Sequence, residues 1–114
     1  MEECIFCKII AREISSQVVY EDDDLLAFQD INPLAPVHVL IVPKSHVSSL
    51  HDLGEEHIDL MGRMMLISGE IAKSENIAQQ GYRVTINYGS DGGQLVPHLH
   101  LHLLGGRKLS GSIG

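Results

Sequence analysis

Three histidines alternate with leucines near the end of the 114-residue sequence, where residues 98–104 are His-Leu-His-Leu-His-Leu-Leu. Successive side chains of a strand point to opposite faces, so the imidazoles of His98, His100 and His102 are expected to share one face. A merely polar face would not need three histidines, because a buried imidazole requires partners for both ring nitrogens. Imidazole can serve as nucleophile, general acid or base, phosphate donor or metal ligand. This segment is therefore the first candidate for a catalytic site.

Strand geometry limits how these histidines can bind a metal. Neighbours on one face of a strand lie about 6.5–7 Å apart, whereas two nitrogens on one tetrahedral zinc lie only about 3.3 Å apart. A single metal can therefore bind one of the three histidines easily and all three only with difficulty. The others remain free for attack on phosphorus, which gives a labile phosphoramidate and divides one hard displacement into two easier ones.

The two cysteines, Cys4 and Cys7, have the spacing of half a tetrahedral zinc site. His46 and His98 are the candidates for the other two ligands. The alternative is a pair of partly buried thiols at a helix start, without a metal. A redox pair is disfavoured because the flanking sequence lacks the preceding strand of a βαβ unit.

The elements that must position these residues follow from hydrophobic periodicity. It predicts a short helix over Phe6–Ile14 and a long helix over Glu55–Asn76. The expected strands are Val18–Glu21, Leu25–Gln29, Val37–Val42, Val84–Asn87 and Leu95–Leu104. The acidic run between the first two strands reads as a solvated hairpin turn. Short turns and one long helix predict a single α+β domain over residues 1–114, built on an antiparallel sheet.

The composition argues against two classes of partner. The formal net charge of −7 argues against nucleic acid and anionic membranes as main partners. No apolar run approaches the roughly 20 residues that span a bilayer. The first residues lack the basic segment and long apolar stretch of a secretion signal. We therefore expect a cytoplasmic protein with neither a nucleic-acid nor a membrane partner.

Residues 98–104 resemble the signature of the histidine triad superfamily. Further blocks of the sequence resemble its nucleotide-binding phosphoramidase branch, in the same order. They are Cys4–Ile10, Ala27–Ile31, Pro36–His38, Pro43–His46, Asn87–Gln94 and Gly105–Arg107. The resemblance covers nearly the whole chain. It implies a homodimeric α+β fold and a hydrolase that cleaves purine nucleoside 5′-phosphoramidates and related conjugates, releasing a nucleoside monophosphate.

The resemblance also assigns roles to single residues. His100 matches the nucleophile that forms a covalent nucleotidyl-histidine, His102 matches a histidine that hydrogen-bonds a phosphoryl oxygen, and His38 matches a supporting histidine. Other matches to nucleotide-binding positions are Phe6, Ile9, Phe28, Asp30, Ile31, Leu40, Asn87, Gly93, Gln94 and Val96. Among these, Asp30 matches the carboxylate that accepts from the ribose hydroxyls. Without the resemblance, the apolar residues would be read as core and Asp30 as a turn residue.

The zinc-containing members of the superfamily imply one structural zinc held by Cys4, Cys7, His46 and His98, with no metal required for catalysis. Two features depart from the family pattern. Leu95 stands where some relatives carry a hydroxyl that can donate to the leaving group. The chain contains no Trp, although relatives commonly end in a Trp- and Pro-containing tail, and we expect residues 108–114 to be a flexible tail.

Three other functions remain open at this stage. The same covalent intermediate serves dinucleoside polyphosphate hydrolysis or nucleotidyl transfer. A nucleotide-binding regulatory module with weak activity belongs to a different class, and an intact nucleophile position speaks against it. A zinc-dependent hydrolase would need an open coordination position, whereas four protein ligands close the site.

Overall fold

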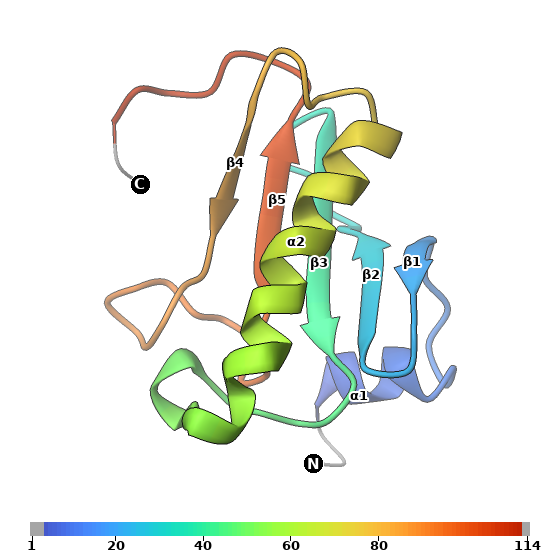
Figure 1. Ribbon diagram of the computed structural model, residues 1–114, viewed down its shortest axis with the longest axis vertical. Helices are drawn as coiled ribbons and strands as arrows, with labels where there is room; N and C mark the ends of the chain where they lie inside the picture. Colours follow the sequence, from blue (N-terminus) through green and yellow to red (C-terminus); the bar gives the residue numbers. More distant parts are fainter. Residues whose placement is uncertain (1–3, 113–114) are drawn as a thin grey trace.

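The computed structural model describes residues 4–112 and forms an α+β fold around one five-stranded antiparallel sheet (Figure 1). Its elements in chain order are α1 (Ile5–Ile10), β1 (Val18–Glu21), β2 (Leu25–Gln29), β3 (Val37–Pro43), two 3-10 turns (Leu50–Asp52 and Glu55–His57), α2 (Ile58–Ser74), β4 (Tyr82–Thr85) and β5 (Leu101–Gly105). The strands lie in the order β1-β2-β3-β5-β4. The expected fold class, with one long and one short helix, is confirmed.

The two faces of the sheet pack against different helices. On one face, α2 lies across the sheet and forms the main core (Figure 1). The buried residues of that core are Leu25, Ala27, Val39, Ile41, Val47, Met64, Ile71, Ala72, Ile77, Leu99, Leu101 and Leu103. On the other face, α1 covers a smaller cluster formed by Cys4, Phe6, Ile9, Leu26, Phe28, Leu40 and Val42. Alternation along β2 and β3 supplies both cores, as expected for strands buried on both sides.

The last strand is shorter than expected, beginning at Leu101 instead of Leu95. Pro97 has no N–H, the His98 amide donates to the Val96 carbonyl at 2.8 Å, and the Leu99 amide donates to the Val47 carbonyl at 2.6 Å. These bonds satisfy the backbone outside the sheet. Residues 98–100 therefore precede the ladder, although their side chains still alternate.

The boundaries of other elements also differ from the sequence-based expectation. The short helix ends at Ile10, because Arg12 adopts a φ of +67° that is incompatible with a continuing right-handed helix. The long helix begins at Ile58, after a 3-10 turn that takes up the expected first residues. The fourth strand lies two residues earlier than expected, at Tyr82–Thr85.

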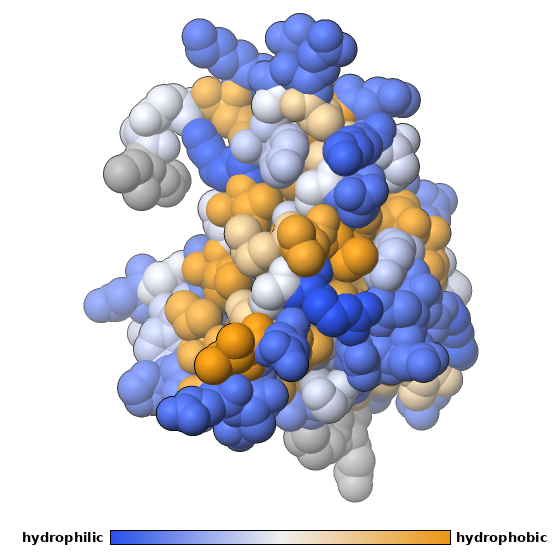
Figure 2. All heavy atoms as spheres, in the orientation of Figure 1, coloured by the Kyte–Doolittle hydropathy of each residue, from blue (hydrophilic) through white to orange (hydrophobic). Residues whose placement is uncertain are grey.

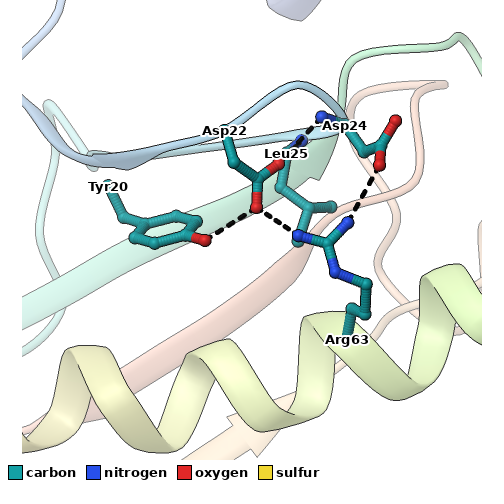
Figure 3. Close-up of polar contacts among 5 residues, drawn as sticks. All are labelled: Tyr20, Asp22, Asp24, Leu25 and Arg63. Carbon is teal, nitrogen blue, oxygen red and sulfur yellow. Dashed lines mark hydrogen bonds and ion pairs between the residues drawn. The ribbon is translucent and has the colours of Figure 1, made fainter.

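The acidic hairpin turn is tied to α2 rather than merely solvated (Figure 3). The Asp22 carboxylate accepts from the Tyr20 hydroxyl and from the amides of Asp24 and Leu25 at 2.7–2.8 Å, and it pairs with Arg63 of α2. Partial burial opposes ionisation, but these donors lower the pKa of Asp22 to about 2. These contacts of Asp22 fix the β1–β2 hairpin against α2.

The expected flexible tail lies partly outside the described residues, which end at 112. Within the described part, the Ser110 carbonyl accepts a hydrogen bond from Arg83 on β4. Among the helices described, none combines the length and apolar composition needed to cross a membrane.

Candidate functional site

The sheet register places two histidines from different strands on the same face. In the β3–β5 ladder, Leu40 lies opposite His102 and His38 lies opposite Leu104. His38 and His102 are therefore diagonal neighbours, a separation that long side chains can bridge. The Nε2 atom of His38 lies 3.0 Å from Nδ1 of His102, and the Asp30 carboxylate lies 3.5 Å from Nε2 of His38.

One main-chain amide sets the direction of the hydrogen bonds in this cluster. The Leu34 N–H donates to Nδ1 of His38 at 3.1 Å, so that nitrogen is an acceptor and the proton of neutral His38 is on Nε2. His38 then donates to Nδ1 of His102, which leaves the proton of neutral His102 on its Nε2. Burial lowers the pKa of His102 to about 4, helped by His100 and His38. Burial also lowers the pKa of His38, against the opposing charge of Asp30, so both rings are neutral at pH 7.

The nucleophile candidate His100 has the opposite tautomer. Its Nδ1 lies 2.7 Å from the main-chain carbonyl of His98. A carbonyl can only accept, so Nδ1 carries the proton and Nε2 of the neutral ring keeps its lone pair. His100 is 6% exposed, and its ring contacts Phe6 edge-on at a centroid distance of 5.1 Å. His102 lies beside it, with ring centroids 5.0 Å apart.

A second cluster is formed by the four predicted metal ligands, Cys4, Cys7, His46 and His98. Their ligand atoms all lie within 4.8 Å of one another. The Nδ1 atom of His98 lies 3.3 Å from the Cys4 sulfur and 3.6 Å from the Cys7 sulfur, and Nδ1 of His46 lies 3.2 Å from the Cys7 sulfur. With Zn–S bonds near 2.3 Å and Zn–N bonds near 2.0–2.1 Å, a tetrahedral site has sulfur–nitrogen edges of about 3.5 Å. The donor set and its spacing therefore fit zinc.

The outer nitrogens of both metal-site histidines also have partners. Nε2 of His98 donates to the Pro43 carbonyl at 2.9 Å, and Nε2 of His46 lies 3.2 Å from the Ser48 hydroxyl. Such partners orient the ligating nitrogen toward the metal. Burial lowers the pKa of His98, which favours the neutral form that binds a metal.

The predicted apolar walls lie in the smaller core, with one exception. Phe6, Ile9, Phe28 and Leu40 are buried there, and Val96 packs against them. Phe6 contacts Phe28 and the rings of His98 and His100 edge-on, so this cluster directly adjoins the histidines. Ile31 does not join it and is 90% exposed.

The predicted phosphate-binding residues Asn87, Gly93 and Gln94 belong to the loop before the histidines. The Asn87 amide donates to the Gly92 carbonyl at 2.7 Å, and Gly93 adopts a φ of +82°. The side chain of Gln94 accepts from the Gly89 amide and donates to the carbonyls of Ser48 and Val96. In this structure both amide side chains brace the loop.

Residues 11–109 match the HIT domain family. The chain belongs to the HIT family. This confirms the resemblance inferred from the histidine triad and its flanking blocks.

Several HIT relatives are similar along almost their whole length. A protein of Escherichia coli (strain K12) named purine nucleoside phosphoramidase is 50% identical over 108 residues, which cover 95% of this chain and 91% of the relative. A Brassica juncea protein named 14 kDa zinc-binding protein is 46% identical over 110 residues, covering 95% of this chain and 96% of the relative. The crystal structure of a HIT family hydrolase from Legionella pneumophila Philadelphia 1 superposes with a TM-score of 0.96 at 43% identity, covering 98% of this chain and all of that one.

Sequence reasoning missed the main-chain groups that orient His38 and His98 of this HIT protein. The Leu34 amide fixes His38, and the Pro43 carbonyl fixes His98. Every residue type supplies such groups, so the identities of Leu34 and Pro43 carry no signal. Ser48, the side-chain partner of His46, was also missed. Its only clue in the sequence is a hydroxyl two residues after a candidate ligand.

Proposed function

We propose that this HIT protein hydrolyses purine nucleoside 5′-phosphoramidates and related nucleotide conjugates through a covalent nucleotidyl-His100 intermediate. The observation that carries the proposal is the 2.7 Å contact between Nδ1 of His100 and the His98 carbonyl, which directs a lone pair to Nε2. The name of the Escherichia coli relative supports the substrate class.

In the proposed reaction, Nε2 of His100 forms a bond to the α-phosphorus while the bond from phosphorus to the leaving nitrogen breaks. The leaving amine takes up a proton from solvent and departs. Water then attacks the same phosphorus and gives a proton back to solvent, the bond to His100 breaks, and the nucleoside monophosphate is released. His102, with its proton on Nε2, donates to a phosphoryl oxygen and stabilises the charge that develops there. His38 holds His102 in this donor form.

The nucleotide is bound by the residues around this cluster. Asp30, whose carboxylate lies beside His38, accepts from the ribose hydroxyls. The purine packs on the apolar cluster that adjoins the histidines, with the exposed Ile31 next to Asp30 as its outer wall. Gly93, Asn87 and Gln94 lie around the phosphate, where the loop that the two amides brace offers main-chain donors.

The second cluster holds a structural zinc through Cys4, Cys7, His46 and His98. Four protein ligands close a tetrahedral site, so the metal contributes folding stability. The sulfur–nitrogen distances and the name of the Brassica juncea relative support this assignment. Catalysis needs no metal, because His100, His102 and His38 supply the nucleophile and the donor.

A second copy of the chain covers the outer face of α2, giving a homodimer. Apolar side chains are exposed along this face (Figure 2), including Ile58, Met65 and Leu66, and Tyr82 is exposed on the adjoining edge strand β4. An unpaired edge beside an apolar stripe is typical of an interface. Sedimentation tests this assignment: we expect a dimer, and Leu66→Glu should give a monomer.

We place the protein in the cytoplasm. Neither cysteine forms a disulfide, and unpaired cysteines are favoured in a compartment that keeps thiols reduced. Cell fractionation with an antibody to the protein tests this placement.

Release of AMP from adenosine 5′-phosphoramidate by the purified protein and by His100→Ala tests the central proposal. We expect turnover in the wild type and a loss of about 10⁴-fold in the variant. A quenched wild-type reaction should contain nucleotidylated protein that is absent in the variant. Dinucleoside polyphosphates are tested beside it, and faster cleavage of these would favour the other hydrolase class. A folded protein that binds AMP but cleaves neither substrate would support the regulatory-module alternative.

A further inference from the structure

Arg107, outside the two clusters, contacts the loop that orients His38. It lies just after β5, and its Nη2 donates to the Leu34 carbonyl at 3.0 Å. Its Nη1 donates to the Lys108 carbonyl at 3.1 Å. One guanidinium therefore joins the segment after β5 to the loop between β2 and β3.

The backbone before Arg107 is shaped for this contact. Gly105 pairs with Val37 at the end of the β3–β5 ladder. Gly106 has a φ of +95°, and a side chain there would place its Cβ 2.8 Å from Cβ of Pro36. Glycine permits both the positive φ and the close approach. The chain can thus pass directly over residues 36–37, which brings Arg107 within reach of Leu34.

Leu34 connects this arginine to the histidines. Its carbonyl accepts from Arg107, and its own N–H donates to Nδ1 of His38. Its side chain is 72% exposed, so packing of that side chain does not hold the residue in place. The hydrogen bond from Arg107 instead holds the Leu34–Ala35 peptide, which directly follows the Pro33–Leu34 peptide that carries the donor.

The tautomer of His38 depends on that donor. With the Leu34 N–H in place, Nδ1 must accept, and the proton is on the nitrogen that faces His102. Without it, the proton of neutral His38 can move to Nδ1. Nε2 would then carry a lone pair toward the lone pair on Nδ1 of His102, 3.0 Å away, and His102 would have to move its own proton to Nδ1.

We propose that Arg107 is a positioning residue: by holding Leu34, it keeps His38 in the tautomer that leaves the proton of His102 on Nε2. The consequence for catalysis rests on the function proposed above. The tautomer itself does not depend on that function and can be measured separately.

Ring-nitrogen NMR of protein labelled with ¹⁵N-histidine tests the proposal directly, because protonated and unprotonated ring nitrogens have well-separated shifts. In the wild type we expect an unprotonated Nδ1 and a protonated Nε2 for His38 at pH 7. Arg107→Ala should give averaged His38 shifts, and Arg107→Lys, which can still donate one hydrogen bond to Leu34, should restore most of the wild-type pattern. The matched control is Arg12→Ala, which removes an exposed arginine that pairs with Glu21 on the edge strand β1.

Turnover of adenosine 5′-phosphoramidate is the second readout. We expect kcat of Arg107→Ala to fall about three- to tenfold with KM changed less than twofold, since one hydrogen bond is lost and the donor to the phosphoryl oxygen is weakened. Unchanged His38 shifts in Arg107→Ala would overturn the inference, whatever happens to kcat. An equal fall in kcat in Arg12→Ala would also overturn it. If Arg107→Ala shifts the tautomer of His38 but the wild-type protein cleaves no phosphoramidate, the inference stands and the proposed function is wrong.

Discussion

The two histidine clusters draw on the same short segment but differ in the partners around them. Nδ1 of His98 lies near two sulfurs, and the ring of His98 makes a T-shaped contact with the ring of His46. His102 points a ring nitrogen at another imidazole, which lies beside a carboxylate. The first set has the soft ligands that suit zinc. The second is a chain of N–H donors and acceptors that ends at a group able to donate outward. Two histidines of the same segment thus have different chemical roles because different groups surround them.

The difference can be traced to which ring nitrogen is occupied inside the fold. His98 gives its Nε2 to the Pro43 carbonyl and keeps Nδ1 for the Cys cluster. His100 gives its Nδ1 to the carbonyl of His98 and keeps Nε2. His102 accepts at Nδ1 and so carries its proton on Nε2. Main-chain groups therefore decide which of the three rings is a ligand, a nucleophile or a donor.

Exchanging one residue in each cluster gives the largest expected contrast. His100→Asn removes the nucleophilic nitrogen, while its amide N–H can still reach the His98 carbonyl. We expect kcat to fall about 10⁴-fold, with the zinc content and melting temperature close to wild type. His98→Ala should instead lose zinc and lower the free energy of unfolding by about 3–5 kcal/mol, because it empties a fully buried site.

Single-turnover kinetics, metal analysis and urea denaturation measure these effects on the same preparations. Zinc loss in His100→Asn, or full zinc content in His98→Ala, would show that the two clusters are not separate in the way described.

Removing the metal from the wild type tests the same separation without a mutation. The main chain of His98 is held by Val96, and Leu99 is held by Val47, so the carbonyl that orients His100 does not depend on the metal. A strong chelator should lower the free energy of unfolding by about 3 kcal/mol or more, the stabilisation expected from a ligand at 100 times its Kd. In the folded protein, kcat should fall less than about tenfold.

Urea denaturation and AMP release measure both quantities, and readdition of zinc is the control. A chelated protein that stays folded but loses all activity would favour the zinc-hydrolase alternative.

Acid should destabilise the His38–His102 cluster in a defined pH range. Because burial lowers the pKa of His102 from 6.5 to about 4, the unfolded chain binds the proton more tightly than the folded one. The free energy of unfolding should therefore decrease as the pH falls from about 6.5 to 4, by up to about 3 kcal/mol, and this contribution is complete above pH 6.5. Urea denaturation at each pH of the wild type and of His102→Gln measures it. The variant should have the shallower slope, and an equal slope would assign the effect to other groups.

The alternation of residues 98–104 predicted the faces correctly, but the strand begins six residues later than expected, at Leu101 instead of Leu95. Leu99, Leu101 and Leu103 all lie in the α2-side core, and Phe6 of α1 contacts His98 and His100. Periodicity reports which way side chains point in an extended chain, and it holds whether or not a neighbouring strand pairs. The start of β5 depends on where the backbone amides of residues 98 and 99 find acceptors, and those acceptors are main-chain carbonyls.

The two clusters differed in how far sequence could predict them. The Cys-x-x-Cys spacing predicted half of a zinc site, and the family resemblance supplied His46 and His98, which the structure brings together. The partners of His38 were harder to predict, because its orientation depends on the Leu34 amide and on register across the β3–β5 ladder. Neither the position of a main-chain amide nor the strand register can be read from residue types.

The smallest expected effect concerns the carboxylate beside His38. Asp30 stabilises the charged form of that imidazole, so its charge raises the pKa of His38 against the effect of burial. Asp30→Asn should therefore lower the pKa of His38 further, and only slightly, since the partner lies at the edge of hydrogen-bonding range. Following the His38 ring shifts in an NMR pH titration measures the change. Asp23→Asn is the matched control. Asp23 precedes β2 and Asp30 follows it, so the two residues lie roughly 17 Å or more apart along the strand. This distance exceeds the screening length of about 8–10 Å, so the charge of Asp23 should have little effect on His38. A rise in the pKa of His38 in Asp30→Asn, or an equal fall in Asp23→Asn, would mean that the carboxylate does not act on His38 through its charge, and the His38–His102 cluster would then be a chain of hydrogen bonds alone.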